Sequence, residues 1–297
     1  MAVQTPVTFT SQGLKLAGIV HTPEDLKPGE KRPAFIVLHG FGSNMNSGNS
    51  MEPCAMFDQL GYVSMRFDMP GCGISEGERG NMICLEQVQA TSDALTMLAQ
   101  HPAVNADQIG VVGSSFGGAV AVYVGGVDKR VAAVISSGGW GDGERKFRGQ
   151  HPGAEAWKKF TDMLAAGEGY RAKNGKPMMV PRYDIVPIPE HLRNNLSQNS
   201  NNEFTWETVR SMYDFRADDV IGQTAPRPIL LLHSSNDSVT PTEQSIEMFK
   251  RAAQPCDLHL FAETDHFMFG ENNTRVRSVI YDWLDKYLPV RAKAKAA

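Results

Sequence analysis

The sequence predicts an α/β fold: a mostly parallel central sheet with helices on both faces and an inserted helical cap. Short, continuous apolar runs recur along the chain, and most are followed by a longer stretch with helical character. Such runs are typical of strands buried on both faces of a sheet, and strand and helix alternation is typical of parallel sheets. One long interruption, between residues 140 and 225, predicts the inserted segment.

The predicted sheet begins with a hairpin and continues as buried strands. Residues 7–10 and 14–21 alternate apolar and polar side chains around Gln12-Gly13, which indicates two antiparallel strands. The next run, 34–38, reads Ala-Phe-Ile-Val-Leu and has the composition of a strand covered on both faces. Further strands are predicted at residues 62–67, 109–112, 131–135, 229–232 and 257–261.

Helices are predicted between or after these strands. A helix that joins two strands can cross one face of the sheet and return the chain in the same direction, as a parallel sheet requires. The predicted helices span residues 51–60, 85–100, 116–125, 242–253 and 274–287.

Residues 140–225 do not continue this alternation. They contain several prolines and asparagines and three of the four tryptophans, among them Trp140 and Trp206. Structureless connections longer than about 12–15 residues are uncommon in compact domains. We therefore predict a largely helical cap at 140–225, which separates a first core part at 1–139 from a second core part at 226–297.

Composition argues against several classes of function. The 297 residues carry 29 Lys and Arg against 33 Asp and Glu, a formal net charge of −4, so no basic face is expected to attract nucleic acid. No stretch approaches the roughly 18 apolar residues of a membrane span, and the first residues lack the pattern of a secretory signal. Four cysteines without Cys-x-x-Cys spacing indicate separate reduced thiols rather than a zinc or redox site. We expect a soluble cytoplasmic protein, monomeric or homo-oligomeric.

Residues 113–117 read Gly-Ser-Ser-Phe-Gly and lie between a predicted strand and a predicted helix. In this context Ser115 is the candidate nucleophile of a G-x-S-x-G elbow. The sharp turn strains the serine backbone, so the flanking positions 113 and 117 need glycine or a very small residue. The turn presents the hydroxyl above a helix N-terminus, where the Phe116 N–H and the helix dipole can stabilise an oxyanion.

Two later strands are followed by loops with the residues that a nucleophilic serine needs. Asp237 follows the strand predicted at 229–232, and Asp265 and His266 follow the strand predicted at 257–261. Side chains after different parallel strands can converge at the carboxyl edge of the sheet. We predict that His266 is the base and that Asp237 orients it; Asp265 is the alternative acid, although adjacent side chains usually diverge and Asp265 can instead fix the loop.

With these motifs the chain resembles the α/β-hydrolase superfamily from about residue 14 to residue 288. The elbow at 113–117, the His-Gly-Phe-Gly sequence at 39–42 and the D-x-x-G-x-G-x-S loop at 68–75 match its motifs in order, and the nucleophile, acid and base follow in its order Ser, Asp, His. Within the superfamily the chain is similar to bacterial feruloyl or cinnamoyl esterases, serine aminopeptidase-like hydrolases and the dienelactone hydrolase group. Most dienelactone hydrolases use Cys as the nucleophile, so Ser115 departs from that group.

The resemblance implies acyl transfer through a covalent intermediate. His266 removes the Ser115 proton, Asp237 holds the imidazole in the useful tautomer, and the N–H groups of Phe41 and Phe116 bind the oxyanion. His39 matches the oxyanion-loop histidine, which organises backbone rather than transferring protons. Such a cycle needs no metal and no organic cofactor.

The substrate is harder to predict. Trp140 and Trp206, together with Trp157 and Phe160, can line an apolar pocket under the predicted cap, or can pack the cap's own core. The sequence does not choose between these two interpretations. The basic cluster Arg145, Lys146 and Arg148 can receive a substrate carboxylate, but a solvated charged loop is the favoured interpretation of it.

The leading hypothesis is a serine hydrolase, carboxylesterase-like, that cleaves carboxylic esters of small molecules. An amidase or peptidase of the same fold is one alternative, and a noncatalytic ligand-binding protein of this fold is another, which the complete set Ser115, Asp237 and His266 disfavours. A dinucleotide-binding oxidoreductase is excluded on its residues, because the glycine-rich turn at 113–118 is not G-x-G-x-x-G and does not belong to the first strand and helix unit.

Overall fold

A mixed, mostly parallel sheet of eight strands forms the centre of the computed structural model, which describes residues 2–269 and 273–290. The first hairpin is antiparallel and joins the sheet antiparallel to β4, while the remaining strand pairs are parallel. In spatial order the strands are β1 (Ala2–Ser11), β2 (Leu14–Pro23), β4 (Val63–Phe67), β3 (Arg32–Leu38), β5 (Val104–Ser114), β6 (Val131–Ser137), β9 (Ile229–Ser234) and β10 (Cys256–Phe261).

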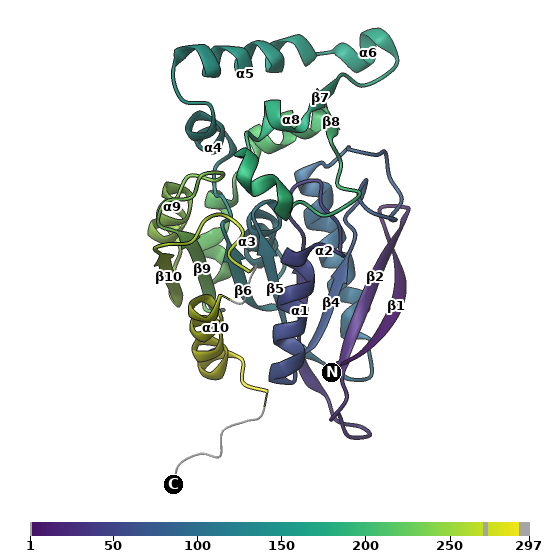
Figure 1. The fold of residues 1–297 in the computed structure, drawn as a ribbon. Coiled ribbons are helices and arrows are strands. Elements are labelled where there is room, and N and C mark those ends of the chain that lie inside the picture. The colour runs from purple at the N-terminus through teal and green to yellow at the C-terminus, as the bar shows by residue number, and fades with distance from the viewer. Residues whose placement is uncertain (1, 270–272, 291–297) are drawn as a thin grey trace.

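Helices cover both faces of this sheet, as predicted (Figure 1). Strand β3 is buried along its whole length, and its side chains alternate between the two layers. Phe35 stacks on Phe57 of α1 with ring centroids 4.3 Å apart, whereas Ile36 joins the core on the opposite face. The helices that follow the sheet strands are α1 (Gly48–Leu60), α2 (Cys84–Ala99), α3 (Phe116–Val127), α9 (Glu243–Arg251) and α10 (Thr274–Tyr287).

The predicted cap segment is largely helical and also contains a two-stranded sheet. Its strands are β7 (Met179–Pro181) and β8 (Glu203–Thr205). Figure 1 shows α5, α6, α8 and this small sheet gathered at one end of the molecule. Its helical elements are α4 (Gly143–Gln150), α5 (Ala154–Gly167), α6 (Tyr170–Asn174), α7 (Arg182–Ile185), α8 (Trp206–Asp214) and the 3-10 helices η1 (Glu190–Asn195), η2 (Ala217–Asp219) and η3 (Ile221–Thr224). The division of the chain at residues 140 and 225 stays a prediction.

The register of the central strands brings three carboxyl ends together. Ser114, the last residue of β5, pairs with Ser137 of β6, which in turn pairs with Leu232 of β9. The loops that leave these strands and β10 therefore emerge at one edge of the sheet. This edge carries the predicted site.

None of the helices in the described ranges 2–269 and 273–290 combines the length and the apolar composition needed to cross a bilayer.

Candidate active site

Ser115 occupies the predicted elbow between β5 and α3. Its backbone has φ 56° and ψ −116°, a conformation that side-chain-bearing residues rarely adopt and that costs roughly 1–3 kcal/mol. The Ser115 N–H donates to the Ser137 carbonyl at 2.7 Å, which ties the strained turn to β6. A Cβ on Gly113 would lie 2.1 Å from the Gly117 carbonyl oxygen, and one on Gly117 would lie 2.6 Å from the Leu38 carbonyl oxygen. Close backbone approach therefore requires both glycines.

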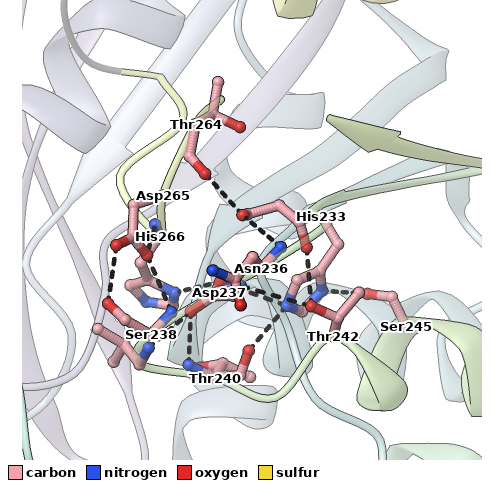
Figure 2. Close-up of polar contacts among 12 residues, drawn as sticks. His233, Asn236, Asp237, Ser238, Thr240, Thr242, Ser245, Thr264, Asp265 and His266 are labelled. Carbon is pink, nitrogen blue, oxygen red and sulfur yellow. Dashed lines mark hydrogen bonds and ion pairs between the residues drawn. The ribbon is translucent and has the colours of Figure 1, made fainter. Parts of the chain in front are cut away.

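The predicted acid and base lie against each other at the same edge of the sheet. His266 Nδ1 is 2.8 Å from Asp237 Oδ2, and both side chains are buried (Figure 2). The other oxygen, Oδ1, accepts the N–H groups of Val239 at 2.8 Å and Thr240 at 2.7 Å. With Nδ1–H donated to Asp237, His266 keeps Nε2 free to take a proton. Ser115 and His266 both line one small pocket.

A second histidine, which the sequence analysis did not assign to the site, supports Asp237. His233 Nε2 lies 3.0 Å from the Thr240 carbonyl oxygen and 3.3 Å from Asp237 Oδ2, so this nitrogen carries the proton. His233 Nδ1 lies 2.6 Å from the Ser245 hydroxyl. Burial alone would raise the pKa of Asp237, but His266 and His233 outweigh it and hold the pKa below its usual range. Asp237 is therefore a carboxylate at neutral pH.

Asp265 accepts hydrogen bonds from Ser238 and from the His266 backbone, and it thereby fixes the two loops (Figure 2). Its Oδ1 accepts the N–H groups of Ser238 at 2.9 Å and of His266 at 2.7 Å, and its Oδ2 accepts the Ser238 hydroxyl at 2.8 Å. The geometry thus gives Asp237 the contact expected of the triad acid and Asp265 the loop contacts named as its alternative.

His39 organises the backbone of the loop after β3. Its Nδ1 lies 2.9 Å from the Gly40 carbonyl oxygen, and the Met69 N–H donates to its Nε2 at 3.1 Å. The second contact requires an unprotonated Nε2, and complete burial lowers the pKa of His39 in agreement with a neutral ring. Phe116 is the first residue of α3, so its N–H has no acceptor within the helix. The pairing of this N–H with that of Phe41 as an oxyanion hole stays a prediction.

Arg182 of α7 reaches from the cap segment to the same loop, a contact that the sequence analysis missed. Its guanidinium donates to the Phe41 carbonyl at 2.9 Å, to the Gly42 carbonyl at 3.1 Å and to the Asn201 carbonyl at 2.8 Å. The side chain is 1% exposed. Burial lowers the pKa of Arg182 to about 10, so the group is still charged at neutral pH.

The pocket that contains Ser115 and His266 is narrow. Its volume is about 40 Å³, small beside the roughly 300–1,000 Å³ of ordinary ligand sites. The cap residues Val186, Ile188 and Leu196 contribute to its lining, together with Phe41, Val239 and Phe267. The site thus lies between the carboxyl edge of the sheet and the cap segment.

Trp140 and Trp206, predicted as candidate pocket residues, are not among the described residues that line this pocket. Trp206 donates its indole N–H to the Leu164 carbonyl of α5 at 3.0 Å, and Trp140 packs edge-on against Phe215. Both side chains are buried in the core. The structure therefore favours the packing interpretation for both tryptophans.

The favoured interpretation of the basic cluster, a solvated loop, is wrong. Its three residues belong to helix α4, and Lys146 is 2% exposed with its Nζ 3.9 Å from the centroid of the Phe147 ring. Burial lowers the pKa of Lys146 to about 7. Arg145 instead pairs with Asp218 at 2.8 Å. The sequence signal was local charge, which does not reveal that α4 turns this one lysine inward.

Among residues 2–269 and 273–290, no group of three or more His, Cys, Asp or Glu side chains is arranged to hold a metal ion.

Comparison with known proteins agrees with this architecture. The family described as serine aminopeptidase, S33, matches residues 29–273. The crystal structure of hypothetical protein PA2218 from Pseudomonas aeruginosa is similar with a TM-score of 0.82 and 24% identity, and the match covers 97% of this chain and 94% of that one. This likeness concerns the fold and confirms the predicted α/β-hydrolase architecture.

Two fungal relatives match over most of their length. Polyketide transferase grgF from Penicillium sp is 26% identical over 298 residues, which cover 95% of each chain. Thiohydrolase aneE from Aspergillus aculeatus is 26% identical over 278 residues, which cover 87% of this chain and 84% of that one.

Proposed function

Since this chain belongs to the serine aminopeptidase S33 family of α/β-hydrolases, we propose that it is a serine hydrolase that cleaves carboxylic esters of small molecules through an acyl-enzyme. The observation that carries the proposal is a strained, pocket-facing Ser115 in one cavity with His266, whose Nδ1 is held by Asp237. Strain at a single exposed nucleophile is typical of active sites. A noncatalytic binding protein needs neither the strain nor the buried carboxylate.

In the proposed reaction, His266 Nε2 takes the Ser115 proton as the hydroxyl oxygen attacks the ester carbonyl carbon. The resulting oxyanion accepts the N–H groups of Phe41 and Phe116, and the dipole of α3 stabilises the same charge. The imidazolium then protonates the departing alcohol, which leaves an acyl group on Ser115. A water activated by His266 releases the acid and restores the serine.

The lining of the cavity points to an apolar acyl group. Six of its side chains are purely hydrocarbon, those of Phe41, Val186, Ile188, Leu196, Val239 and Phe267. Because the cavity holds only about 40 Å³, a substrate of ordinary size requires the cap residues to move outward. Substrate selection is therefore proposed to rest on residues 186–196 more than on the tryptophans.

Acyl transfer to an acceptor other than water is a second candidate. Two observations favour it: a relative similar over 95% of the chain is named a polyketide transferase, and the narrow cavity leaves little room for water. Both reactions share the acyl-enzyme and differ in the group that attacks it. The same reasoning admits thioesters as acyl donors, since a relative is named a thiohydrolase.

A panel of aryl and alkyl esters, matching thioesters and anilides, with acyl groups of graded length, tests the proposal. We expect turnover of esters or thioesters by the wild-type chain and none above the oxyanion-hole background by Ser115→Ala. Added alcohols should divert product from the acid to a new ester if transfer is favoured. Ligand binding without turnover of any panel member would identify a noncatalytic protein, and faster cleavage of anilides than of esters would identify an amidase.

A further inference from the structure

Three residues of the cap segment hold the loop that carries the predicted oxyanion donor. Arg182 donates to the carbonyls of Phe41 and Gly42, and the ring of Phe204 in β8 stacks on that of Phe41 with centroids 3.9 Å apart. The Asn201 N–H also donates to the Gly42 carbonyl at 2.8 Å. All three partners lie in the segment 140–225, whereas Phe41 and Gly42 follow the core strand β3.

Gly42 makes this close approach possible. Its φ is 56°, in the left-handed region, and a Cβ there would lie 2.2 Å from Phe204 Cζ and 2.8 Å from Arg182 Nη2. The backbone of the loop is therefore in direct contact with the Arg182 guanidinium, with no side chain between them. An outward movement of the cap would break these contacts together.

Arg182 is a buried cation without an acidic partner in the described part of the chain. Its hydrogen-bond acceptors there are the carbonyls of Phe41, Gly42 and Asn201, and none of the ion pairs found among the described residues includes it. Burying a charge that has no ion-pair partner is costly, and folds retain such a group where it meets a negative charge or holds backbone in place. The charge lies at the pocket in which Ser115 is expected to generate an oxyanion.

We propose that Arg182 is the positioning residue of the oxyanion loop: it aligns the Phe41 peptide for the oxyanion only when the cap is closed, and its buried charge favours the anionic intermediate over the neutral ester. The inference rests on the proposed function, because it concerns the oxyanion of that reaction. The charge-assisted hydrogen bond from Arg182 to the Phe41 carbonyl restricts rotation of the peptide between Phe41 and Gly42. Because Phe41 joins this peptide to the preceding one, the same bond also restricts the direction in which the Phe41 N–H points. Stabilisation of the oxyanion then depends on closure of the cap.

The test compares Arg182→Met and Arg182→Lys with the wild-type chain. Methionine keeps an unbranched but shorter side chain and removes the charge, and lysine keeps the charge but lacks the planar guanidinium. Kinetics of an aryl ester and affinity for an alkyl boronic acid, which forms a tetrahedral anionic adduct with the serine, are measured in parallel. A misaligned oxyanion donor should cost less than complete loss of one, which costs about 10²–10³ in kcat.

We expect Arg182→Met to lower kcat by about 10- to 100-fold with little change in KM, and to weaken boronate affinity by the same factor, since transition-state analogues report the same interactions. Arg182→Lys should lie between Met and the wild type. Wild-type kcat and boronate affinity in folded Arg182→Met would overturn the inference, as would a loss confined to KM. If Arg182→Met does not fold, an unchanged kcat in Arg182→Lys would overturn it instead.

Arg227 offers a matched control. It is half-buried and also clamps backbone carbonyls, those of Asp128, Val131, Gly125 and Gln223, but at the opposite end of α3. Arg227→Met should lower the melting temperature without changing kcat or boronate affinity; equal kinetic losses in both variants would overturn the positioning role. A wild-type chain that neither turns over esters nor binds the boronate would refute the proposed function itself. That result differs from an active wild type whose kcat and boronate affinity do not change when Arg182 is replaced, which would refute only the role of Arg182.

Discussion

Replacing Asp237 by Asn should remove most of the activity by forcing His266 into the wrong tautomer. Asp237 Oδ1 accepts two backbone N–H groups, from Val239 and Thr240. The amide oxygen of an asparagine must stay at that position, because its NH₂ group cannot accept them. The NH₂ group is then placed where Oδ2 now faces His266 Nδ1 at 2.8 Å. Since two donors cannot share this contact, Nδ1 becomes the acceptor and Nε2 carries the proton.

An imidazole protonated at Nε2 cannot accept the Ser115 proton. In comparable chemistry this change costs up to about 10⁴ in kcat, or about 5 kcal/mol of transition-state stabilisation. Asp265→Asn should cost about tenfold at most. Its amide oxygen can still accept the N–H groups of Ser238 and His266, and its NH₂ group can donate to the Ser238 hydroxyl, which accepts as readily as it donates.

The assay is initial-rate kinetics of both variants and the wild type on one activated aryl ester, with thermal melts to establish that each protein is folded. We expect the kcat of Asp237→Asn to fall by at least about 10³ and that of Asp265→Asn by no more than about tenfold. A larger loss in Asp265→Asn, from a protein that melts like the wild type, would refute the assignment of the acid and the tautomer reasoning with it.

Further predictions concern the nucleophile, the buried lysine and the cap. Ser115→Ala should abolish ester turnover and leave the melting temperature within a few degrees of wild type, because it removes one hydroxyl at a turn; turnover near the wild-type rate would contradict it. The pKa of Lys146 is lowered to about 7 in the folded protein and lies near 10.4 in the unfolded chain. Burial of the charged lysine therefore costs most below pH 7, where the wild type should be least stable relative to Lys146→Met. In urea denaturation, the stability advantage of Lys146→Met should shrink by about 2–3 kcal/mol between about pH 6 and about pH 9; a pH-independent advantage would contradict this. Trp206→Ala should lower the free energy of unfolding by about 3–5 kcal/mol and change the turnover of small and bulky esters equally. Ile188→Ala should instead change the discrimination between these esters by about 1–3 kcal/mol. The reverse pattern would show that Trp206 lines the substrate pocket.

The sheet was predictable because its strands are short and buried. The run at 34–38 is apolar at every position, and β3 is buried from Arg32 to Leu38. The local pattern at 113–117 likewise predicted a strand, an elbow and a helix, because the glycines at 113 and 117 are required by contacts with neighbouring backbone. Both features leave a local sequence pattern, although the contact that excludes a side chain at Gly117 is with Leu38 of the distant strand β3.

Other features of the site depend on contacts between distant segments, which periodicity does not record. Arg182 lies about 140 positions from Phe41 in the chain, and nothing local in its sequence indicates a partner among loop carbonyls. His233 is the last residue but one of β9, a strand with an apolar pattern, and its contact with Asp237 follows from how the next loop folds back. The inward turn of Lys146 and the packing of Trp206 against α5 also depend on tertiary contacts that override composition.

Active-site labelling with a fluorophosphonate, followed by peptide mapping, tests the central claim most directly, because the reagent reacts with a serine whose hydroxyl is activated by a neighbouring base. We predict one label per chain, on the peptide that contains Ser115, strongly slowed in Asp237→Asn and absent in Ser115→Ala. A chain that stays unlabelled, or one that carries the label on another residue when Ser115 is replaced, would contradict the claim that Ser115 is the nucleophile of a working triad.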